Sequence, residues 1–309
     1  MLKNISFQPS RIEKSTPTSI ISTITYVYHM ELDRYRPGFL LYTDRHALMT
    51  YDGTTTHLIA GNSTQEGYRE GVGAEARFYT IAGFAQISEK LVIVADYLNS
   101  CLRLIDRTNN NTSEFSGLCG GSLGYENGRP GRFKFLESAV LDKRDKNQLL
   151  IVDPDNLAVR TVNVSSRVVD TFVESDSLQY IKRITQEEKS GDLYVTAKNS
   201  VYRIIYINRT VSLISGNDNG YYRDSTLLDS QFNFPTELIF ITPKNLLVAD
   251  RNNNNLRLLD MNSDKVTTLN VTNSLDRPTS LLLTNNSLYV GQRKKILQCM
   301  CDYYSIFLT

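Results

Sequence analysis

The chain is a series of short apolar runs separated by polar turns. Runs of four to six residues rich in Val, Ile, Leu and Tyr recur along it, and clusters of Asn, Asp and Gly bound them. Runs of this length and composition are typical of β-strands, and no segment in the middle of the chain keeps a helical period over three turns. The pattern therefore predicts an all-β protein.

Three segments can be aligned with one another. Each contains a phenylalanine, an aspartate that ends an apolar run and an arginine in the next run: Phe78, Asp96 and Arg103; Phe135, Asp153 and Arg160; Phe232, Asp250 and Arg257. The spacing from phenylalanine to aspartate is 18 residues, and that from aspartate to arginine is 7 residues, in all three. Two spacings that both hold three times indicate an internal repeat.

Three weaker copies fill the intervals between these segments. They are centred on Asp44, where the hairpin is two residues shorter, and on Thr196 and Gly291, which stand in place of the aspartate. Each copy provides about four short strands, and a four-stranded sheet cannot bury both of its faces alone, so the copies stack around an axis. We therefore predict a six-bladed β-propeller of four-stranded antiparallel blades.

The predicted blades form a single domain over residues 1–309. Their boundaries lie near residues 20–61, 62–120, 121–174, 175–216, 217–270 and 271–309. A propeller ring closes when one terminus completes the blade that the other terminus begins. Two segments have the composition expected of that last outer strand, Ile5 to Gln8 and Tyr304 to Leu308, and the sequence does not choose between them.

The copies resemble NHL repeats. The segment from Gly71 to Phe78 reads G-V-G-A-E-A-R-F, and the turns after Asp96 and Asp250 contain asparagine, as in that family. The resemblance covers about residues 38–300 and is lost at the turns of the fourth and sixth copies. The segment Tyr42-Thr43-Asp44 is also similar to the YWTD propellers, although the chain has no tryptophan. The resemblance implies an NHL-like propeller of the extracellular type.

The recurring aspartates and arginines are expected to be structural. The pairs are Asp96 with Arg103, Asp153 with Arg160, and Asp250 with Arg257. In such a blade the aspartate ends the second strand and the arginine lies across the hairpin, where an ion pair fixes the geometry. A feature that recurs in blade after blade marks the architecture, because a catalytic site is built only once.

The resemblance also brings enzymes into consideration. Amidating lyases resemble NHL propellers and hold zinc with histidines from different blades, whereas His29, His46 and His57 all fall in the first fifth of this chain. A tetrahedral zinc site needs ligands that converge on the channel, so we predict neither a metal site nor catalytic residues.

Calcium is the open alternative among cofactors, because lactonase-type propellers bind it through Glu, Asn and Asp side chains in the channel. The run from Asn252 to Asn255 has such side chains. It lies in a predicted turn, however, where asparagine is expected because it tolerates a left-handed backbone. No cofactor is therefore predicted.

The charge of the chain gives no support to nucleic-acid or membrane binding. The net charge is +1, and Arg293-Lys294-Lys295 is the only compact basic cluster. RNA-binding propellers use a strongly basic face. No apolar run approaches the length of about 18 residues that a membrane span needs, so no direct membrane insertion is expected.

Eight Asn-x-Ser/Thr sequons indicate the secretory route. The predicted glycosylation sites are those in turns, at strand edges or in the last blade: Asn62, Asn111, Asn163, Asn208, Asn270 and Asn285. A glycan could project from such positions, and N-glycosylation takes place in the secretory pathway. The sequons therefore predict a glycoprotein in the extracellular space or the secretory lumen.

The cysteines point to the same compartment. Cys101 begins the third strand of the second blade and Cys119 follows its fourth strand, so the two are symmetric about a hairpin centred near Asn110. Opposed residues of antiparallel strands have about the separation that a disulfide accepts, and we predict a Cys101–Cys119 bridge. Cys299 and Cys301 point the same way in a strand, and their pairing is left open. Disulfides form and persist in oxidising compartments.

These observations favour a recognition scaffold that binds a protein or glycan partner, with no role for nucleic acid. The chain could also be one domain of a larger ectodomain. A propeller suits recognition because rigid blades present variable loops on a broad surface. The alternative is a secreted enzyme, a calcium-assisted lactonase, hydrolase or lyase, with its site in the channel. Tyrosines recur at one repeat position, Tyr68, Tyr125 and Tyr221, and are expected to pack between blades.

Overall fold

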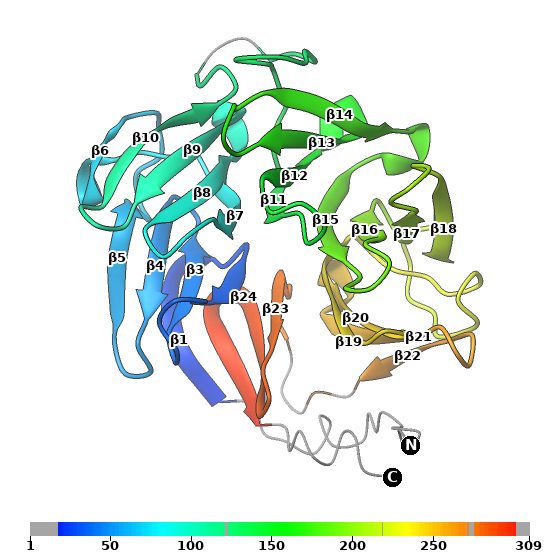
Figure 1. The fold of residues 1–309 in the computed structure, drawn as a ribbon. Helices are drawn as coiled ribbons and strands as arrows, with labels where there is room; N and C mark the ends of the chain where they lie inside the picture. Colours follow the sequence, from blue (N-terminus) through cyan, green and yellow to red (C-terminus); the bar gives the residue numbers. More distant parts are fainter. Residues whose placement is uncertain (1–17, 121–122, 218, 270, 272–274, 301–309) are drawn as a thin grey trace.

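A computed structural model describes residues 18–120, 123–217, 219–269, 271 and 275–300. The described chain forms six sheets that stand around a central axis (Figure 1). All strand pairs within the sheets are antiparallel. The predicted six-bladed β-propeller is therefore confirmed. No helix in these residues is long and apolar enough to span a membrane.

The first three blades follow one another along the chain. Blade 1 contains β2 (Met30–Leu32), β3 (Leu40–Asp44), β4 (Ala47–Tyr51) and β5 (Thr56–Gly61). Blade 2 contains β7 (Ile81–Gln86), β8 (Leu91–Asp96), β9 (Cys101–Asp106) and β10 (Asn111–Ser116), with β6 (Gly71–Val72) added at its outer edge. Blade 3 contains β11 (Ser138–Leu141), β12 (Gln148–Asp153), β13 (Ala158–Asn163) and β14 (Val169–Glu174).

The next two blades repeat this order. Blade 4 contains β15 (Ile181–Gln186), β16 (Leu193–Ala197), β17 (Ser200–Ile204) and β18 (Val211–Gly216). Blade 5 contains β19 (Pro235–Thr242), β20 (Asn245–Asp250), β21 (Asn255–Asp260) and β22 (Lys265–Leu269). Short 3-10 turns complete the fold: η2 (Gly73–Glu75), η3 (Tyr97–Asn99), η4 (Pro154–Asn156), η5 (Asp176–Leu178) and η6 (Arg251–Asn253).

Blade 6 joins the two ends of the described chain. It contains β23 (Ser280–Leu283), β24 (Ser287–Met300) and β1 (Thr18–Tyr26), and β1 pairs with the second half of β24. The side chain of Gln298 donates to Ser287 and Tyr289, so the two halves of β24 lie side by side. The N-terminal strand thus belongs to the last blade rather than to the first. The two segments considered from the sequence, 5–8 and 304–308, lie outside the described residues.

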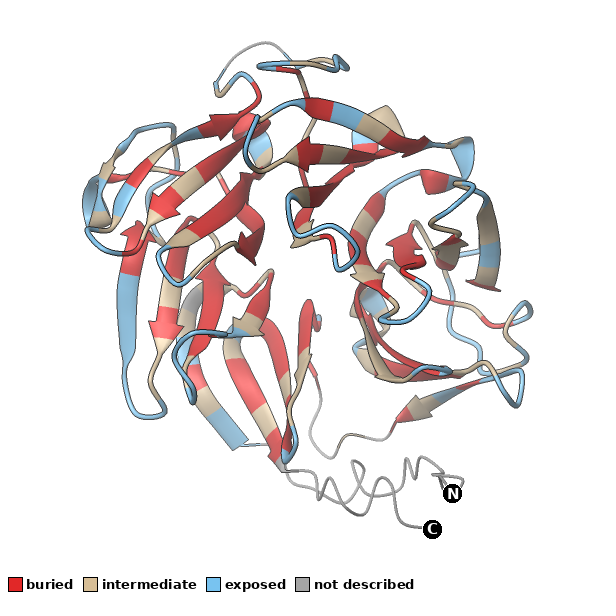
Figure 2. Ribbon diagram, viewed as in Figure 1, coloured by how far each residue is buried: buried red, intermediate tan, exposed pale blue. Residues whose placement is uncertain are grey.

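The hydrophobic core is divided among the interfaces between neighbouring blades (Figure 2). Six clusters of buried side chains join blade 1 to 2, 2 to 3, 3 to 4, 4 to 5, 5 to 6 and 6 to 1. In β8, Val92 and Val94 face one cluster while Ile93 and Ala95 face the next. Each middle strand is therefore apolar on both faces, which explains the continuous apolar runs in the sequence.

The strand register corrects the repeat positions in blades 3, 4 and 6. In blade 6, Gly291 pairs with Ser280 as Ala95 pairs with Gly83, so Gln292 and not Gly291 takes the place of the aspartate. Phe78, Phe133 and Phe232 are buried beside the three repeated arginines, so Phe133 and not Phe135 is the counterpart in blade 3. The spacing of 18 residues to the aspartate therefore holds in two blades, and the spacing of 7 residues holds in all three. In blade 4 the last residue of the second strand is Ala197, which pairs with Ile181 as Asp96 pairs with Ile81. Ala197, and not Thr196, takes the place of the aspartate.

Candidate functional site

One residue from the innermost strand region of every blade lies at an equivalent level along the axis. Each is opposite the next-to-last residue of the second strand, as Gly83 is opposite Ala95 and Arg183 is opposite Thr196. We call this set the inner ring: His29, Gly83, Ser138, Arg183, Glu237 and Ser280. Because the ring combines a basic residue, an acidic residue, a histidine and three small residues, it differs from blade to blade where the rest of the repeat does not.

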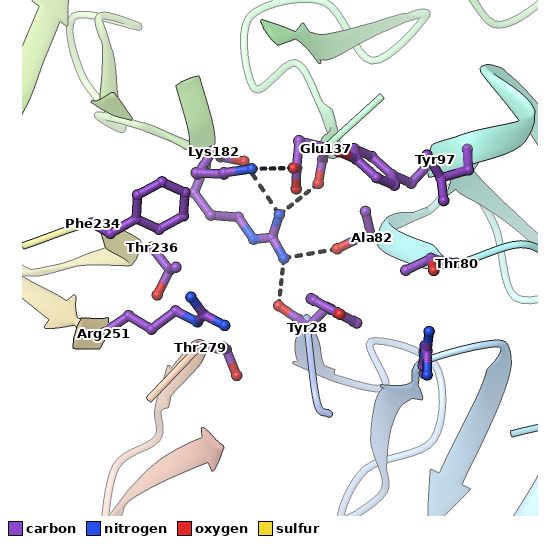
Figure 3. A pocket seen from close by; sticks show the side chains of 13 residues that line it. Tyr28, Thr80, Ala82, Tyr97, Glu137, Lys182, Phe234, Thr236, Arg251 and Thr279 are labelled. Carbon is purple, nitrogen blue, oxygen red and sulfur yellow. Dashed lines mark hydrogen bonds and ion pairs between the residues drawn. The ribbon is translucent and has the colours of Figure 1, made fainter. Parts of the chain in front are cut away.

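Arg183 crosses the channel from blade 4 and closes it. Its guanidinium donates to the carbonyl oxygens of Tyr28 in blade 1, Ala82 in blade 2 and Glu137 in blade 3 (Figure 3). Its Nε lies 3.5 Å from a carboxylate oxygen of Glu237 in blade 5. A Cβ at Gly83 would lie 3.1 Å from Cα of Ser138, so the backbones of blades 2 and 3 approach closely at this level. A single buried side chain therefore links five blades, and it forms a floor within the channel.

A chain of buried charges continues from Arg183 below this floor. Glu237 lies 3.3 Å from Nδ1 of His29, and Glu31 lies 3.5 Å from Nε2 of the same ring. Burial works to lower the pKa of His29, but the hydrogen bonds and charges of Glu237 and Glu31 outweigh it and raise that pKa. The same histidine holds the pKa of Glu31 below its usual value against the opposing effect of burial.

Above the floor the channel opens into a cavity of about 310 Å³. The residue that precedes each inner-ring residue lines it, so that every blade contributes one side chain. We call this set the mouth ring: Tyr28, Ala82, Glu137, Lys182, Thr236 and Thr279. Loop residues complete the wall: Arg45, Thr80, Tyr97, Leu98, Phe234 and Arg251. Figure 3 shows Tyr97, Phe234 and Arg251 directed toward the opening from blades 2 and 5.

The mouth carries an excess of positive charge. Arg45, Lys182, Arg183 and Arg251 line it together with one acidic side chain, Glu137, which forms an ion pair with Lys182. Burial raises the pKa of the Tyr28 hydroxyl, and the charges of Arg45 and Arg251 oppose that rise. Burial also raises the pKa of Tyr97 to about 12, so both tyrosines stay neutral at physiological pH.

The opposite end of the channel has a separate cavity of about 390 Å³. Its charged lining is mixed and includes Glu31, Arg34, Lys143, Lys146 and Glu188. Glu188 lies 2.7 Å from Lys143, and Glu31 lies 3.8 Å from Arg34. The two cavities lie on either side of the Arg183 floor and differ in the balance of their charges.

The repeated aspartates and arginines form buried clamps near the rim. The carboxylate oxygen lies 3.4, 3.0 and 2.8 Å from the guanidinium in the pairs Asp96–Arg103, Asp153–Arg160 and Asp250–Arg257, and all six side chains are fully buried. Each arginine also donates to two backbone carbonyls of the segment that leads into its own blade. Burial raises the pKa of Asp96 to about 6, although Asn99, the Tyr79 amide and Arg103 lower it. Its carboxylate is therefore ionised at neutral pH.

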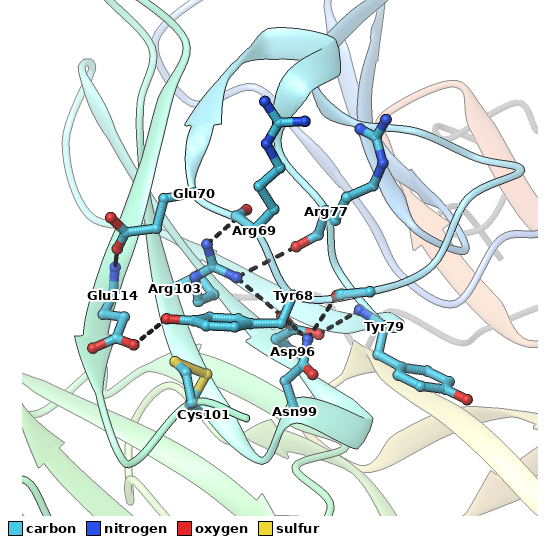
Figure 4. The surroundings of a disulfide bond; sticks show 12 residues. Tyr68, Arg69, Glu70, Arg77, Tyr79, Asp96, Asn99, Cys101, Arg103 and Glu114 are labelled. Atoms are coloured by element: carbon cyan, nitrogen blue, oxygen red, sulfur yellow. Dashed lines mark hydrogen bonds and ion pairs between the residues drawn. A yellow bond between two sulfur atoms is a disulfide. The ribbon is translucent and has the colours of Figure 1, made fainter. Parts of the chain in front are cut away.

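An aromatic ring covers each clamp from outside (Figure 4). The guanidiniums of Arg103, Arg160 and Arg257 lie 4.9, 4.6 and 4.9 Å from the ring centroids of Tyr68, Tyr125 and Tyr222. The third tyrosine is therefore Tyr222 and not Tyr221. These rings are about half exposed. The prediction that the tyrosines pack between blades is therefore wrong. The rings shield the buried ion pairs from water.

The structure contains the predicted Cys101–Cys119 disulfide, with a Cα–Cα distance of 5.0 Å. Figure 4 shows the bridge beside the clamp of blade 2. Cys299 is buried in blade 6, and Cys301 lies outside the described residues. The bridge joins the start of β9 to the segment after β10.

Five of the predicted glycosylation sites lie in turns or at strand ends within the described residues. Asn111, Asn208 and Asn285 are exposed, and Asn62 and Asn163 are half-buried in turns. The side-chain oxygen of Asn62 accepts from Thr64, and that of Asn163 accepts from Ser165 and Ser166. Asn270 lies outside the described residues. Glycosylation itself stays a prediction.

The asparagine run of blade 5 forms a turn. Asn252 and Asn253 belong to η6, Asn254 has a left-handed backbone with a φ of 55°, and Asn253 donates to Asp250. Within the described residues, no group of three or more His, Cys, Asp or Glu side chains is arranged to hold a metal ion. Whether the chain binds calcium stays open.

The sequence did not reveal the channel residues. Arg183, Glu237 and His29 come from three blades, and no local spacing connects them. The available signal is a charged residue directly before an apolar one in the first strand of a blade, as in Arg183-Ile184 and Glu237-Leu238. Such a residue has to be paired when it is buried, so it marks a position on the axis.

No protein-family model and no curated protein matches the chain. Solved structures share its fold. An auxiliary nutrient binding protein from Bacteroides ovatus ATCC 8483 aligns over 91% of this chain and 72% of its own, with a TM-score of 0.69 and 11% identity. XC5397 from Xanthomonas campestris, a gluconolactonase, aligns over 96% and 94%, with a TM-score of 0.65 and 8% identity. A chain of the nidogen/laminin complex aligns over 81% and 83%, with a TM-score of 0.57 and 11% identity. These likenesses establish the propeller fold.

Proposed function

We propose that this protein is a recognition propeller that binds a partner at the mouth of its channel. The observation that carries the proposal is the mouth ring, to which all six blades contribute, above a floor closed by Arg183. A blind cavity in which polar groups converge between aromatic walls is a usual form of a binding site. Propeller neighbours that bind nutrients or form a protein complex are in keeping with this role.

The location that we propose is the extracellular space or the secretory lumen. The Cys101–Cys119 disulfide and the position of the described sequons in turns or at strand ends support it, because both belong to the secretory route. Assignment to the NHL family is part of the same proposal. Its support is the aspartate and arginine clamp with its asparagine turn, which recurs in blades 2, 3 and 5.

The test is capture of partners from the native secretory fraction on the immobilised full chain. The double substitution Tyr97→Ala and Phe234→Ala removes two rings of the mouth. Tyr125→Ala removes a more exposed ring at the rim and serves as the control. We expect the mouth variant to lose its specifically captured proteins and the rim variant to keep them, by quantitative mass spectrometry. Equal capture by both variants would reject the mouth as the binding site.

A secreted enzyme is the second candidate, and the likeness to a gluconolactonase over nearly the whole of both chains is the observation that favours it. Such an enzyme would use calcium in the channel. Calorimetric titration with Ca²⁺ and an assay of lactone hydrolysis test this candidate. Calcium binding that Glu237→Gln abolishes, together with turnover, would replace the recognition proposal.

A further inference from the structure

The proposed recognition function leaves the chemistry of the partner open, and the charges of the mouth restrict it. Four cationic side chains and one acidic side chain line the cavity, and Lys182 already pairs with Glu137. Arg183 is committed to three carbonyls and to Glu237. Two cations then remain for a ligand, one in blade 1 and one in blade 5.

These two cations, Arg45 and Arg251, have only weak partners. Arg45 lies 3.9 Å from Glu66, and both side chains are nearly half exposed. Arg251 donates at 3.4 Å to the neighbouring Asn252 and lies 5.9 Å from the ring of Phe234. Both arginines act on the hydroxyl of Tyr28, so their charges reach the same part of the cavity. A positive potential in a cavity with apolar walls attracts an anion more strongly than the same charges would in open water.

The walls between these cations are largely apolar. Tyr97, Leu98 and Phe234 stand beside the opening, and Ala82 lies deeper. An acidic sugar would place several hydroxyl groups against these apolar walls, where each would lose hydrogen bonds to water without gaining a partner. A partner with an acidic side chain beside an apolar side chain would match both the positive charge of the mouth and its apolar walls. A volume of about 310 Å³ suits one or two side chains.

We infer that the mouth receives an acidic side chain from a loop of a protein partner. Its carboxylate is bound between Arg45 and Arg251, and an adjacent apolar side chain packs against Tyr97 and Phe234. Arginine suits this role because its planar guanidinium can donate two parallel hydrogen bonds to one carboxylate. This inference rests on the proposed function and specifies the partner of that same site.

The test uses two peptide probes with the full chain at low ionic strength. N-acetyl-Phe-Glu-amide carries the carboxylate, and N-acetyl-Phe-Gln-amide is its neutral isostere. Binding is followed by NMR line broadening of the probes, which detects millimolar affinity. We expect the Glu probe to bind about fivefold to tenfold more tightly than the Gln probe, because one charge pair at a partly desolvated site contributes a difference of this size. The preference should decrease steeply with added salt.

Three variants locate the effect. Arg251→Gln should remove most of the preference for the Glu probe, and Arg251→Lys should restore part of it by returning the charge. Arg69→Gln is the control, because Arg69 is an exposed arginine of the rim and its loss changes the net charge equally. A thermal melt of each variant checks the fold, which substitution of a weakly paired loop side chain should leave intact.

Three outcomes would overturn the inference: equal binding of the two probes, no binding of either, or a preference that Arg69→Gln reduces as much as Arg251→Gln. Selective binding of glucuronate over glucose without binding of the Glu probe would overturn it in favour of an acidic glycan. The proposed function fails separately. It is lost if capture of native partners is insensitive to Tyr97→Ala with Phe234→Ala.

Discussion

Two kinds of buried arginine hold this propeller together, and they differ in how often they occur. Arg103, Arg160 and Arg257 occupy one repeat position, each with its own aspartate and its own tyrosine. Arg183 occurs once, on the axis, and it takes its partners from five blades. The first kind builds single blades, and the second joins blades and closes the channel. The repeated arginines therefore mark the architecture of the blades, and the single Arg183 marks the axis, where we propose that the site lies.

The largest expected effect is on a rim clamp. Arg160→Ala leaves the fully buried carboxylate of Asp153 without its cation, and removing one partner of a buried pair costs about 3–5 kcal/mol. We expect urea unfolding to show a loss of this size in the free energy of unfolding. Arg69→Ala at the exposed rim should change it by no more than about 0.5 kcal/mol. A small loss for Arg160→Ala would remove the clamp from the architecture.

A smaller loss is expected on the axis. Arg183→Met keeps the length of the side chain but removes its donors, so buried carbonyls of Tyr28, Ala82 and Glu137 lose a partner. These residues line the mouth cavity, where water can replace the lost donors, and Glu237 keeps His29, so the cost should be about 2 kcal/mol rather than that of a broken isolated pair. Urea unfolding measures this cost. Arg183→Met with Glu237→Gln should be less destabilised than the sum of the two single variants. If the loss of stability in the double variant equalled the sum of the two single losses, Arg183 and Glu237 would not be coupled.

The axis should also respond to pH. The pKa of His29 is raised in the folded protein, so its stabilising contribution is complete below the unfolded value of 6.5 and is lost as pH rises through the folded value. The groups that face it are Glu237, Glu31 and, beyond them, Arg183 and Arg34.

Denaturant unfolding between pH 6 and pH 9 checks this sign. The wild type should lose stability across that range, and His29→Gln should lose less. His57→Gln is the matched control, because its ring is mostly exposed on β5 and pairs only with the local Asp52. If His57→Gln reduced the pH dependence of stability as much as His29→Gln does, the buried His29 would not be the cause of that dependence.

The smallest effect is expected for the rings that cover the clamps. Tyr125→Leu removes the contact with Arg160 and the hydroxyl bond to Glu174, but leaves the ion pair intact. A cation–π contact at a partly exposed site contributes about 0.5–1 kcal/mol. Urea unfolding should therefore show a loss in this range, well below that of Arg160→Ala. A loss as large as that of the arginine would assign the ring a more central part in the clamp.

The sequence predicted what is local and repeated. The aspartate and arginine lie seven residues apart across one hairpin, so their pairing leaves a constant spacing. The Cys101–Cys119 bridge is present, but Leu102 pairs with Ser116, so Cys119 lies beyond the end of β10 and not opposite Cys101 as the sequence argument assumed. The spacing to phenylalanine failed in blade 3 because Arg132-Phe133-Lys134-Phe135 offers two phenylalanines in one strand-like segment. Pattern alone does not tell which of them is buried beside the arginine.

The axis could not be predicted in the same way. Arg183 meets Tyr28 across 155 residues and Glu237 meets His29 across 208 residues. These contacts exist only after the ring has closed, and they occur once each, so no internal copy shows them. The strand that closes the ring was missed for a related reason. Its pairing with β24 depends on the two ends of the chain meeting in space.

Photocrosslinking tests most directly whether the partner binds on the axis rather than at the rim. A benzoylphenylalanine is placed at position 97 in the mouth or at position 125 on the rim, and the full chain is irradiated in its native secretory fraction. Crosslinked partners should appear from position 97 and be absent from position 125. Crosslinks from position 125 alone, or equal yields of the same partner from both, would contradict the assignment of the mouth as the recognition site.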